Sequence, residues 1–281
     1  KKLSTNVLFE PSHINNEKTE KRIKNLKPGN ILLLENIRFY SQEESNDTNF
    51  SKKISKLGDI YINDSFSTSH RDHASISGLA AFLPSFPGKL LEYELENLNI
   101  ITKNLEDNYS IAILGGSKVS SKIHIIENLL KRFKKILIGG AMANTFLAAK
   151  GFNIGKSFCE VQMKKNAGEL LKIGGDKILL PEDVIVSDSQ EEKTAQSINI
   201  SNISPNDYVY DIGPKTRKNF YNEIQKSQKI LWNGPMGLFE KKPFDNGTNY
   251  IISSIKALNN QKIFSAAGGG DTIAALKSSG N

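Results

Sequence analysis

A pair of glycines followed by two lysines is the first place where this sequence could perform chemistry. Gly115 and Gly116 follow the apolar run 111–114 and precede a stretch of helical period. Glycines let backbone N–H groups approach an anion, and the N-terminus of the next helix adds partial positive charge. Lys118 and Lys122 stand four residues apart, on one helical face. The segment indicates a phosphate site, although a plain strand-to-helix turn with surface lysines stays open.

Two further loops carry groups suited to a nucleotide. Three glycines precede Asp271 and Thr272, so successive backbone amides could bind an anion. Asp271 offers a hard oxygen ligand for Mg²⁺, and Thr272 offers a hydroxyl. Between Trp232 and Glu240 the chain forms a Gly- and Pro-containing loop, in which Asn233 could bind phosphate and Glu240 a ribose hydroxyl. A glycine-rich cap without a ligand, and ordinary turn chemistry, are the alternatives.

Arginine is scarce in this lysine-rich chain, so each Arg raises the question of a bidentate contact. Arg38 lies just beyond the apolar run 31–34, and Arg71 lies in a polar loop, so the two could clamp a phosphate. His70 and His73 flank Arg71 without a third ligand nearby, which argues against zinc. We interpret the two histidines as holding the loop or adding positive potential.

Two familiar nucleotide motifs are absent. No G-x-G-x-x-G occurs at the glycine triplet, because Ile273 stands where the last glycine should be. The segment 151–157 is one residue short of a P-loop and follows a helical pattern rather than a strand. A nucleotide site in this chain is therefore neither a Rossmann dinucleotide site nor a Walker site.

The elements that must position these groups are short apolar strands alternating with helices. Runs of three or four apolar residues suit strands buried on both faces of a parallel sheet. Segments of helical period lie between them, which indicates an α/β doubly wound architecture. The polar stretches 43–49 and 187–204 are expected to be exposed loops. The expected strands cover residues 31–34, 60–62, 111–114, 136–138, 178–180, 230–232 and 263–264.

A boundary between two domains is expected after residue 88. Two prolines and a glycine interrupt the pattern within 83–88, and residues 90–98 follow with helical spacing. A helix there could join two lobes, with an ordinary surface helix as the alternative.

Composition excludes several classes of protein. The chain has 281 residues, 37 Lys and Arg against 30 Asp and Glu, and the single cysteine Cys159. These values exclude fibrous and disulfide-scaffold proteins and favour a reducing compartment. No apolar run is long enough for a membrane span. The net charge of +7 is dispersed, which argues against nucleic acid.

Taken together, these segments resemble the phosphoglycerate kinase family over essentially the whole chain. They match family segments in the family order. The matching segments are 33–40, 63–75, 115–122, 139–146, 211–216, 232–240 and 268–272.

The resemblance implies an α/β fold of two doubly wound, Rossmann-like parallel-sheet domains joined by a hinge helix. It places an N-terminal phosphoglycerate-binding domain at 1–88, incomplete at its start, a hinge helix at 89–105, and a C-terminal nucleotide-binding domain at 106–281, incomplete at its end. It implies a phosphotransferase of glycolysis with a carboxyl group as acceptor. The reaction is reversible phosphoryl transfer between 1,3-bisphosphoglycerate and MgADP, giving 3-phosphoglycerate and MgATP.

The resemblance also assigns roles to residues. Arg38 and Arg71 would bind the phosphoglycerate phosphate, and Lys122 and Arg38 would be catalytic, with Lys122 neutralising the transferring group. Asp271 would meet Mg²⁺, Glu240 the ribose, and Gly139, Gly140 and Leu238 the adenine. The full set of implied nucleotide-binding residues is Gly115, Gly116, Lys118, Lys122, Gly139, Gly140, Asn233, Leu238, Glu240, Gly269, Gly270, Asp271 and Thr272.

The partners implied are small molecules: the two phosphoglycerates, ATP and ADP with Mg²⁺, without nucleic acid or membrane, for a cytoplasmic monomer. Ser65 and Ser67 replace small residues usual in the family, and Ala267 stands where Gly is frequent. The family's opening strand and closing glycine-rich segment are missing from the sequence, and its first residue is Lys rather than Met. A catalytically inactive nucleotide-binding fragment therefore stands as the alternative function.

Overall fold

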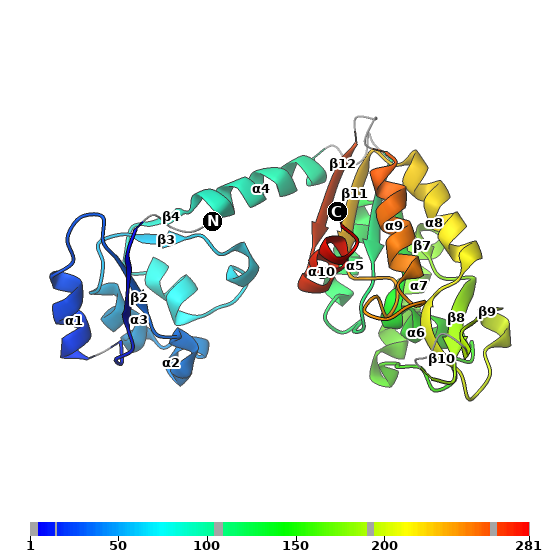
Figure 1. Cartoon of the computed structure of the whole chain (residues 1–281), viewed down its shortest axis with the longest axis horizontal. Coiled ribbons are helices and arrows are strands. Elements are labelled where there is room, and N and C mark those ends of the chain that lie inside the picture. Colours follow the sequence, from blue (N-terminus) through cyan, green and yellow to red (C-terminus); the bar gives the residue numbers. More distant parts are fainter. Residues whose placement is uncertain (1–4, 15, 104–108, 190–193, 259–262, 281) are drawn as a thin grey trace. The chain divides into compact units, whose positions relative to one another are not determined.

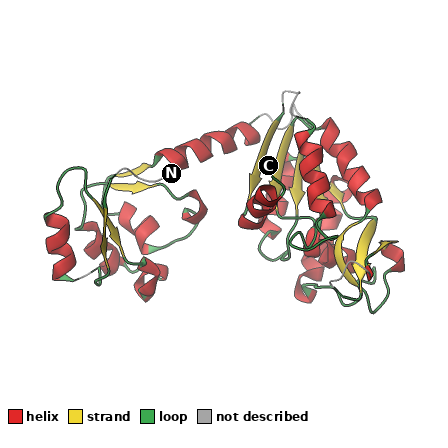
Figure 2. Cartoon of the chain, in the orientation of Figure 1, coloured by secondary structure: helices red, strands yellow, loops and turns green. Residues whose placement is uncertain are grey.

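The structure is a computed structural model that describes residues 5–14, 16–103, 109–189, 194–258 and 263–280. The chain forms two compact units, residues 1–97 and 98–281, each with its own core (Figures 1 and 2). The expected boundary after residue 88 and the hinge helix at 89–105 stay predictions; the end of that helix lies outside the described residues. Within the described ranges, no helix has the length and apolar character to cross a membrane.

The first unit is built from short elements around a small core. The strands form two parallel pairs, β1 with β2 and β3 with β4. The 14-residue helix α4 crosses the division between the units. The elements are β1 (Val7–Glu10), α1 (Glu17–Lys24), β2 (Ile31–Leu34), η1 (Ile37–Phe39), α2 (Ser41–Glu44), α3 (Thr48–Ser55), β3 (Tyr61–Asn63), η2 (Phe66–Thr68), η3 (Ala74–Gly78), β4 (Ser85–Pro87) and α4 (Lys89–Thr102).

The core of the first unit covers one side of its strands. Phe50 and Ile54 of α3 are buried there against Leu79, and Leu34 packs on the cluster. On the opposite face of β2, Leu33 is 57% exposed. The expectation that the run 31–34 is buried on both faces is therefore wrong for the described chain, because no described element covers that second face.

Two details of the first unit also differ from expectation. The stretch 43–49 is not a plain exposed loop, because it includes the end of α2, the start of α3 and the buried Glu43. The proline-containing segment 83–88 includes the strand β4, which pairs with β3. Proline is tolerated in such a strand because β4 lies at an edge of its pair.

The second unit contains a five-stranded parallel sheet in the order β12-β11-β5-β6-β7. The chain runs from β5 outward to one edge and then returns to build β11 and β12 on the other side, which is the doubly wound order. The sheet strands and the helices of the unit are β5 (Ser110–Leu114), α5 (Ile123–Arg132), β6 (Lys135–Ile138), α6 (Gly140–Ala149), η4 (Val161–Met163), α7 (Lys164–Gly174), η5 (Gly175–Lys177), β7 (Ile178–Leu179), α8 (Pro214–Lys226), β11 (Lys229–Asn233), α9 (Asn246–Lys256), β12 (Phe264–Gly268) and α10 (Gly270–Ser278).

Alternate residues of β5 show how both faces of this sheet are buried. Ala112 and Leu114 face a cluster that includes residues of α5, α6 and α7. Ile111 and Ile113 face a second cluster with residues of α8 and α9. These β5 side chains are at most 1% exposed, as expected for a strand covered by helices on both sides. The predicted fold class, α/β with parallel sheets, is confirmed.

A second, antiparallel sheet was not predicted. It joins β8 (Asp183–Ser187), β9 (Gln196–Asn199) and β10 (Tyr208–Ile212) in the order β10-β8-β9. In the chain, β9 is followed directly by the short helix η7 (Ile200–Asn202). The expectation of an exposed loop at 187–204 is wrong where β9 and η7 lie; residues 190–193 are outside the described part. The strand β9 escaped prediction because it is mostly exposed and polar, as an edge strand can be.

Candidate active site

The strands β5 and β11 are neighbours at the point where the strand order of the sheet reverses. In open α/β sheets, ligands bind outside the carboxyl ends of the strands at such a switch point. Gly115 follows β5 and Asn233 ends β11, so two of the predicted loops meet there. The topology therefore agrees with the chemistry expected from the loop residues.

Backbone hydrogen bonds lock these loops together. The Gly115 N–H donates to the Asn233 carbonyl oxygen at 2.9 Å, and the Gly140 N–H donates to the Met236 carbonyl oxygen at 2.8 Å. Gly140 has a φ of +64°, and a Cβ at this position would lie 2.6 Å from the Gly116 nitrogen. Only glycine fits such a close approach in the left-handed region without strain. The glycine loops on this side of the site are thus held with their backbones in close contact.

Lys122 lies at the centre of this arrangement. Its Nζ donates hydrogen bonds to the carbonyl oxygens of Gly115 at 2.7 Å and of Asn233 at 3.1 Å. Burial lowers the pKa of Lys122 to about 8, while the negative charge of Asp271 acts in the opposite direction. The ammonium is therefore partly desolvated and close to the carboxylate, where it can meet an anion with little competing water.

A cavity of about 560 Å³ opens beside these loops. Of the predicted nucleotide-binding residues, those that line it are Gly116, Gly140, Leu238, Glu240 and Asp271. The other predicted residues do not contribute to its lining: they are Gly115, Lys118, Lys122, Gly139, Asn233, Gly269, Gly270 and Thr272.

Three of the residues outside the lining, Asn233, Gly269 and Thr272, are in contact with one another or with the loop that lines it. A Cβ on Gly269 would lie 3.1 Å from Asn233 Nδ2, so the glycine-rich loop lies against the end of β11. The buried Thr272 hydroxyl oxygen accepts a hydrogen bond from the Gly234 N–H at 2.7 Å. Asp271 stands in the first turn of α10, exposed at the edge of the cavity. The loops after β11 and β12 therefore form one connected wall.

Sequence reasoning missed the other wall of the cavity, which is formed by β10 and by residues 156–158. Tyr208 and Tyr210 line the cavity, and their rings stack with centroids 5.9 Å apart. Lys156 and Phe158 also line it. The P-loop-like segment 151–157 is not a Walker site, but its last residues line the cavity. In the sequence, the alternation of Tyr208 and Tyr210 with Val209 is the feature that could have indicated this wall.

The predicted substrate arginines lie in the first unit. Arg38 is exposed in η1, where its N–H donates to Asn36 Oδ1 at 3.1 Å. The Arg71 N–H donates to the Thr68 carbonyl oxygen at 3.0 Å. Within the described part of the chain, neither guanidinium pairs with a carboxylate. Arg38 lies just beyond β2 and Arg71 lies in the loop after η2, and the charge of each guanidinium is available to an anion.

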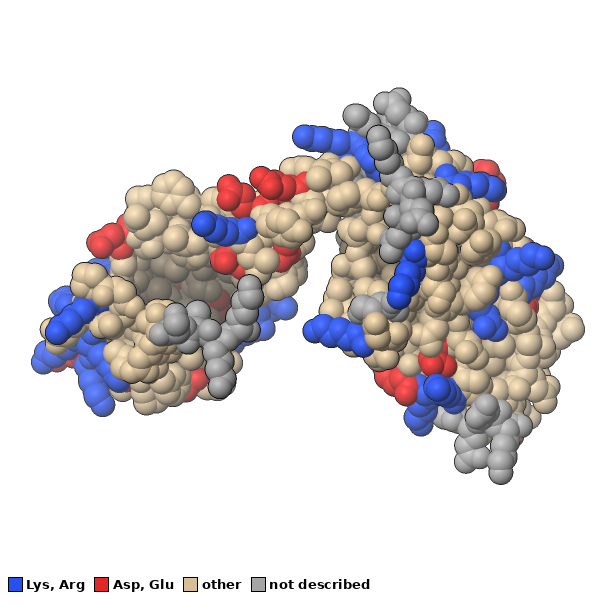
Figure 3. Space-filling view, turned by 45° about the horizontal axis from the view of Figure 1, so that its top comes forward, with Lys and Arg blue, Asp and Glu red and all other residues tan. Residues whose placement is uncertain are grey.

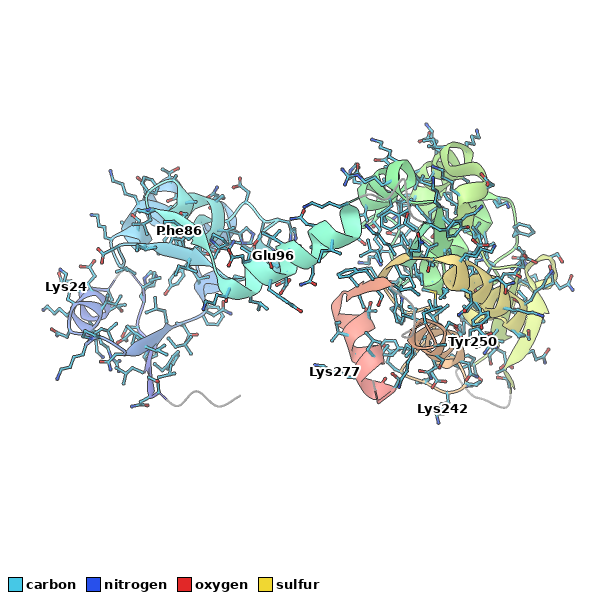
Figure 4. The ribbon with its side chains drawn as sticks, turned by 90° about the horizontal axis from the view of Figure 1, so that it is seen from above. Lys24, Phe86, Glu96, Lys242, Tyr250 and Lys277 are labelled. Atoms are coloured by element: carbon cyan, nitrogen blue, oxygen red, sulfur yellow. The ribbon has the colours of Figure 1, made fainter. Side chains whose placement is uncertain are left out.

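Positive charge elsewhere is scattered. Figure 3 shows Lys and Arg side chains in small groups over the visible face of each unit. Lys277, for example, is exposed on α10, and Lys242 lies on the loop before α9 (Figure 4). Such side chains are solvated, unlike the half-buried Lys122.

The fold and the site define an α/β protein of Rossmann-like topology whose anion-binding loops gather at the switch point of a parallel sheet. The family profile described as phosphoglycerate kinase matches residues 1–281. The chain belongs to the phosphoglycerate kinase family, whose members are transferases of glycolysis, and the predicted family is confirmed.

Individual relatives agree with this assignment. The chain is 43% identical over 268 residues to phosphoglycerate kinase of Dictyoglomus turgidum, covering 94% of this chain and 67% of the relative. It is 46% identical over 262 residues to the enzyme of Finegoldia magna, covering 92% and 65%. The chain thus spans about two thirds of the length of these curated relatives.

Solved structures give the same result. Phosphoglycerate kinase from Coxiella burnetii matches with a TM-score of 0.79 and 38% identity, over 92% of this chain and 68% of that one. The enzyme from Pyrococcus horikoshii OT3 matches with a TM-score of 0.82 and 30% identity, over 98% and 70%. The two-domain α/β fold predicted from the sequence is therefore that of solved phosphoglycerate kinases.

Proposed function

We propose that the full-length protein is a phosphoglycerate kinase that transfers a phosphoryl group reversibly between 1,3-bisphosphoglycerate and MgADP. The observation that carries this proposal is the half-buried Lys122 at the switch point, surrounded by glycine backbone and facing Asp271. That set of groups suits the phosphates of a nucleotide, and the family assignment supplies the reaction.

The nucleotide is proposed to lie in the cavity of the second unit. Gly139, Gly140 and Leu238 would flank the adenine, and Glu240 would accept from a ribose hydroxyl. Lys118, Lys122, Asn233 and the loop 269–272, with the amides of Gly115 and Gly116, would hold the phosphates. This assignment is supported by the lining of the cavity, to which the segments after β5, β6, β11 and β12 all contribute residues.

Asp271 suits a magnesium ion bound together with the nucleotide. Mg²⁺ is usually held by one or two carboxylates plus substrate phosphates rather than by a protein cage. Among the described residues no cluster of three or more His, Cys, Asp or Glu could hold a metal ion alone. The exposed Asp271 carboxylate at the cavity edge fits the former arrangement, and the ion would supply charge to the phosphate oxygens.

In the first unit, Arg38 and Arg71 would bind the phosphate of the phosphoglycerate. A planar guanidinium can give a phosphate two parallel hydrogen bonds, which an ammonium cannot. From the family resemblance, we propose that Arg38 also takes part in catalysis.

The chemistry asks for placement and charge rather than covalent help. An oxygen of the terminal ADP phosphate attacks the phosphorus of the acyl phosphate, and the phosphorus–oxygen bond to the acyl group breaks, leaving a carboxylate. Because a carboxylate is a good leaving group, no general acid is needed. Positive charge on the equatorial oxygens, from Lys122 and the glycine amides, stabilises the transition state.

We further propose that α4 acts as a hinge whose bending brings the two substrates into line. Closure would exclude the water that otherwise hydrolyses an acyl phosphate. From the family assignment we also propose that the protein is a cytoplasmic monomer that binds small-molecule substrates and has no nucleic-acid or membrane partner.

A coupled assay beside nucleotide titration tests the function. The full-length enzyme is expected to form 1,3-bisphosphoglycerate from 3-phosphoglycerate and MgATP. For the 281-residue chain itself, MgADP binding without turnover would support the fragment alternative, which no comparison favours. Absence of MgADP binding in both proteins would contradict the proposed site.

A further inference from the structure

A buried carboxylate lies behind the loop that carries the two phosphate-site lysines. Glu160 is 7% exposed. Its Oε2 accepts a hydrogen bond from the Ser120 N–H at 3.0 Å, and its Oε1 accepts one from Ser120 Oγ at 2.6 Å. Glu160 therefore holds the backbone and the side chain of one loop residue, 40 positions earlier in the chain.

Glu160 is itself fixed from the other side. Its N–H donates to the hydroxyl oxygen of Thr145 at 3.1 Å, and Thr145 is fully buried in α6. Although burial acts to raise the pKa of Glu160, hydrogen bonds from Ser120 and the charge of Lys118 bring it below its usual value. The group is thus an ionised carboxylate at a rigid position.

Ser120 occupies the middle of the loop that sets both lysines. Lys118 precedes it by two residues, and Lys122 follows it by two. The Lys122 N–H donates to the Val119 carbonyl oxygen at 2.8 Å, and the Val119 side chain is fully buried. No side chain caps the N-terminus of α5, which begins one residue after Lys122. Besides a hydrogen bond from Ser121 Oγ to the Lys118 carbonyl oxygen at 3.1 Å, the centre of the loop is held by the Val119 anchor and by Glu160.

We propose that Glu160 is a positioning residue of the nucleotide site, which fixes Ser120 so that Lys118 and Lys122 are placed for the nucleotide phosphates. Glu160 does not line the cavity, and it acts only through the loop. A preplaced loop spares the cost of ordering two lysine side chains when the phosphates bind. The inference rests on the proposed function, because it takes the two lysines as phosphate ligands.

The first unit contains a matched contact that serves as a control. Glu43 is 2% exposed, and it accepts hydrogen bonds from the Ser75 N–H at 2.9 Å and from Ser75 Oγ at 2.6 Å. The same buried carboxylate–serine contact thus occurs in the unit without the nucleotide cavity. Glu43 also lies 3.6 Å from His73 Nδ1, so Glu43→Gln removes the same charge from a similar contact and reports at least the general cost of such a loss.

The test compares MgADP with adenosine, which lacks phosphates, by calorimetric titration of the 281-residue chain and its variants. We expect Glu160→Gln to weaken MgADP binding about tenfold, since a charge-assisted contact is lost, and to leave adenosine binding within about twofold. Ser120→Ala, which removes one of the two hydrogen bonds, should weaken MgADP about threefold. Glu43→Gln should change neither ligand.

Several results would overturn the inference. Unchanged MgADP binding in Glu160→Gln, or an equal loss for adenosine, would show that Glu160 does not place the phosphate ligands. If Glu160→Gln fails to fold, Ser120→Ala decides: a loss confined to MgADP supports the role, and any other pattern rejects it. Failure of both the unaltered chain and the full-length protein to bind MgADP would instead contradict the proposed nucleotide site on which the inference stands.

Discussion

The Lys122 ammonium donates a hydrogen bond of 2.7 Å to the carbonyl oxygen of Gly115, seven residues earlier in the chain. A second hydrogen bond, 3.1 Å long, joins the same ammonium to the Asn233 carbonyl oxygen. The lysine thereby spans the ends of β5 and β11. Neutral carbonyl groups hold the ammonium weakly compared with a phosphate, so a bound nucleotide can draw it away without breaking an ion pair.

In the full-length enzyme, Lys122→Ala is expected to lower kcat by about 10²–10³-fold, more than it weakens MgADP binding. The reason is that the ammonium acts on charge at the transferring phosphoryl group. Steady-state kinetics and equilibrium titration measure the two effects. Lys118→Ala, which removes an exposed lysine of the same loop, should act chiefly on affinity. A loss of affinity with kcat unchanged in Lys122→Ala would place its role in ground-state binding, and an equal loss in both would count against a role chiefly at the transition state.

The binding of MgADP should depend on pH through the same lysine. Since burial lowers the pKa of Lys122 to about 8, the ammonium loses its proton as the pH rises through that value. MgADP affinity should therefore be nearly constant below about pH 7 and fall as the pH passes 8, with about half a proton taken up on binding at pH 8. Calorimetry in buffers of different ionisation enthalpy measures the proton uptake.

The variant Lys122→Arg provides the control for this pH dependence. An arginine stays protonated throughout the range, so its MgADP affinity should show no decline attributable to position 122. The same decline in both proteins would assign the titration to another group.

Much of the site could be predicted because its chemistry is local in sequence. Gly115, Lys122 and Asp271 each lie between a strand of the parallel sheet and the end of the first turn of the next helix, and parallel strands bring such segments together. Glu160 could not be predicted, because its partner Ser120 is 40 residues away and only the packed fold joins them. The tyrosine wall was missed because β10 belongs to a separate antiparallel sheet, and the position of that sheet beside the cavity is decided by the packed fold.

The fold was predictable to a similar degree. Strands covered on both faces, such as β5, are continuous apolar runs and were found. The exposed edge strand β9 has no such pattern, and a proline-containing edge strand such as β4 reads as a loop. The local hydrophobic pattern therefore identifies the strands of the central sheet. Strands such as β4 and β9 form only through their pairing in the folded chain.

Gly140→Ala should destabilise the second unit. At a φ of +64°, an added Cβ would lie 2.6 Å from the Gly116 nitrogen and 2.8 Å from the Pro235 carbonyl oxygen. We expect a loss of about 2–4 kcal/mol in the free energy of unfolding, from strain in the left-handed region and from contact with rigid backbone. Urea denaturation followed by the fluorescence of Trp232, the single tryptophan, measures the loss.

The matched control is Gly168→Ala, in the interior of α7. A Cβ there meets no atom within 4 Å. This substitution should raise the free energy of unfolding by about 0.5–1 kcal/mol, because alanine favours a helix over glycine. Similar shifts for the two variants would show that the backbone around Gly140 yields to the added methyl group.

Asp211 should make the stability of the second unit depend on pH. The residue is 2% exposed; its Oδ2 accepts a hydrogen bond from the Gly247 N–H at 2.6 Å, and its Oδ1 has no hydrogen-bond partner within the described chain. Burial raises the pKa of Asp211 to about 8, although hydrogen bonds from Gly247 and Ile212 act in the opposite direction. The folded state therefore holds a proton that the unfolded chain releases from about pH 4 upward.

The sign of this effect follows from proton linkage. Where the folded state binds more protons, the free energy of unfolding falls as pH rises, here from about pH 4 to about pH 8. Asp211→Asn removes the titrating group, so the variant should match the unaltered chain near pH 4 and exceed its stability by about 5 kcal/mol at pH 8. Urea denaturation at pH 5, 6.5 and 8, which are about evenly spaced across this window, measures the difference.

Asp183→Asn is the control for loss of a well-satisfied buried carboxylate. Asp183 accepts hydrogen bonds from the Lys215 N–H at 2.8 Å and the Thr216 N–H at 2.7 Å, at the start of α8. Its substitution should cost about 1–3 kcal/mol at pH 8, because charge-assisted bonds to the helix N-terminus are weakened. If Asp211→Asn instead loses stability at pH 8 as Asp183→Asn does, Asp211 is ionised in the folded protein and the expected pH dependence is wrong.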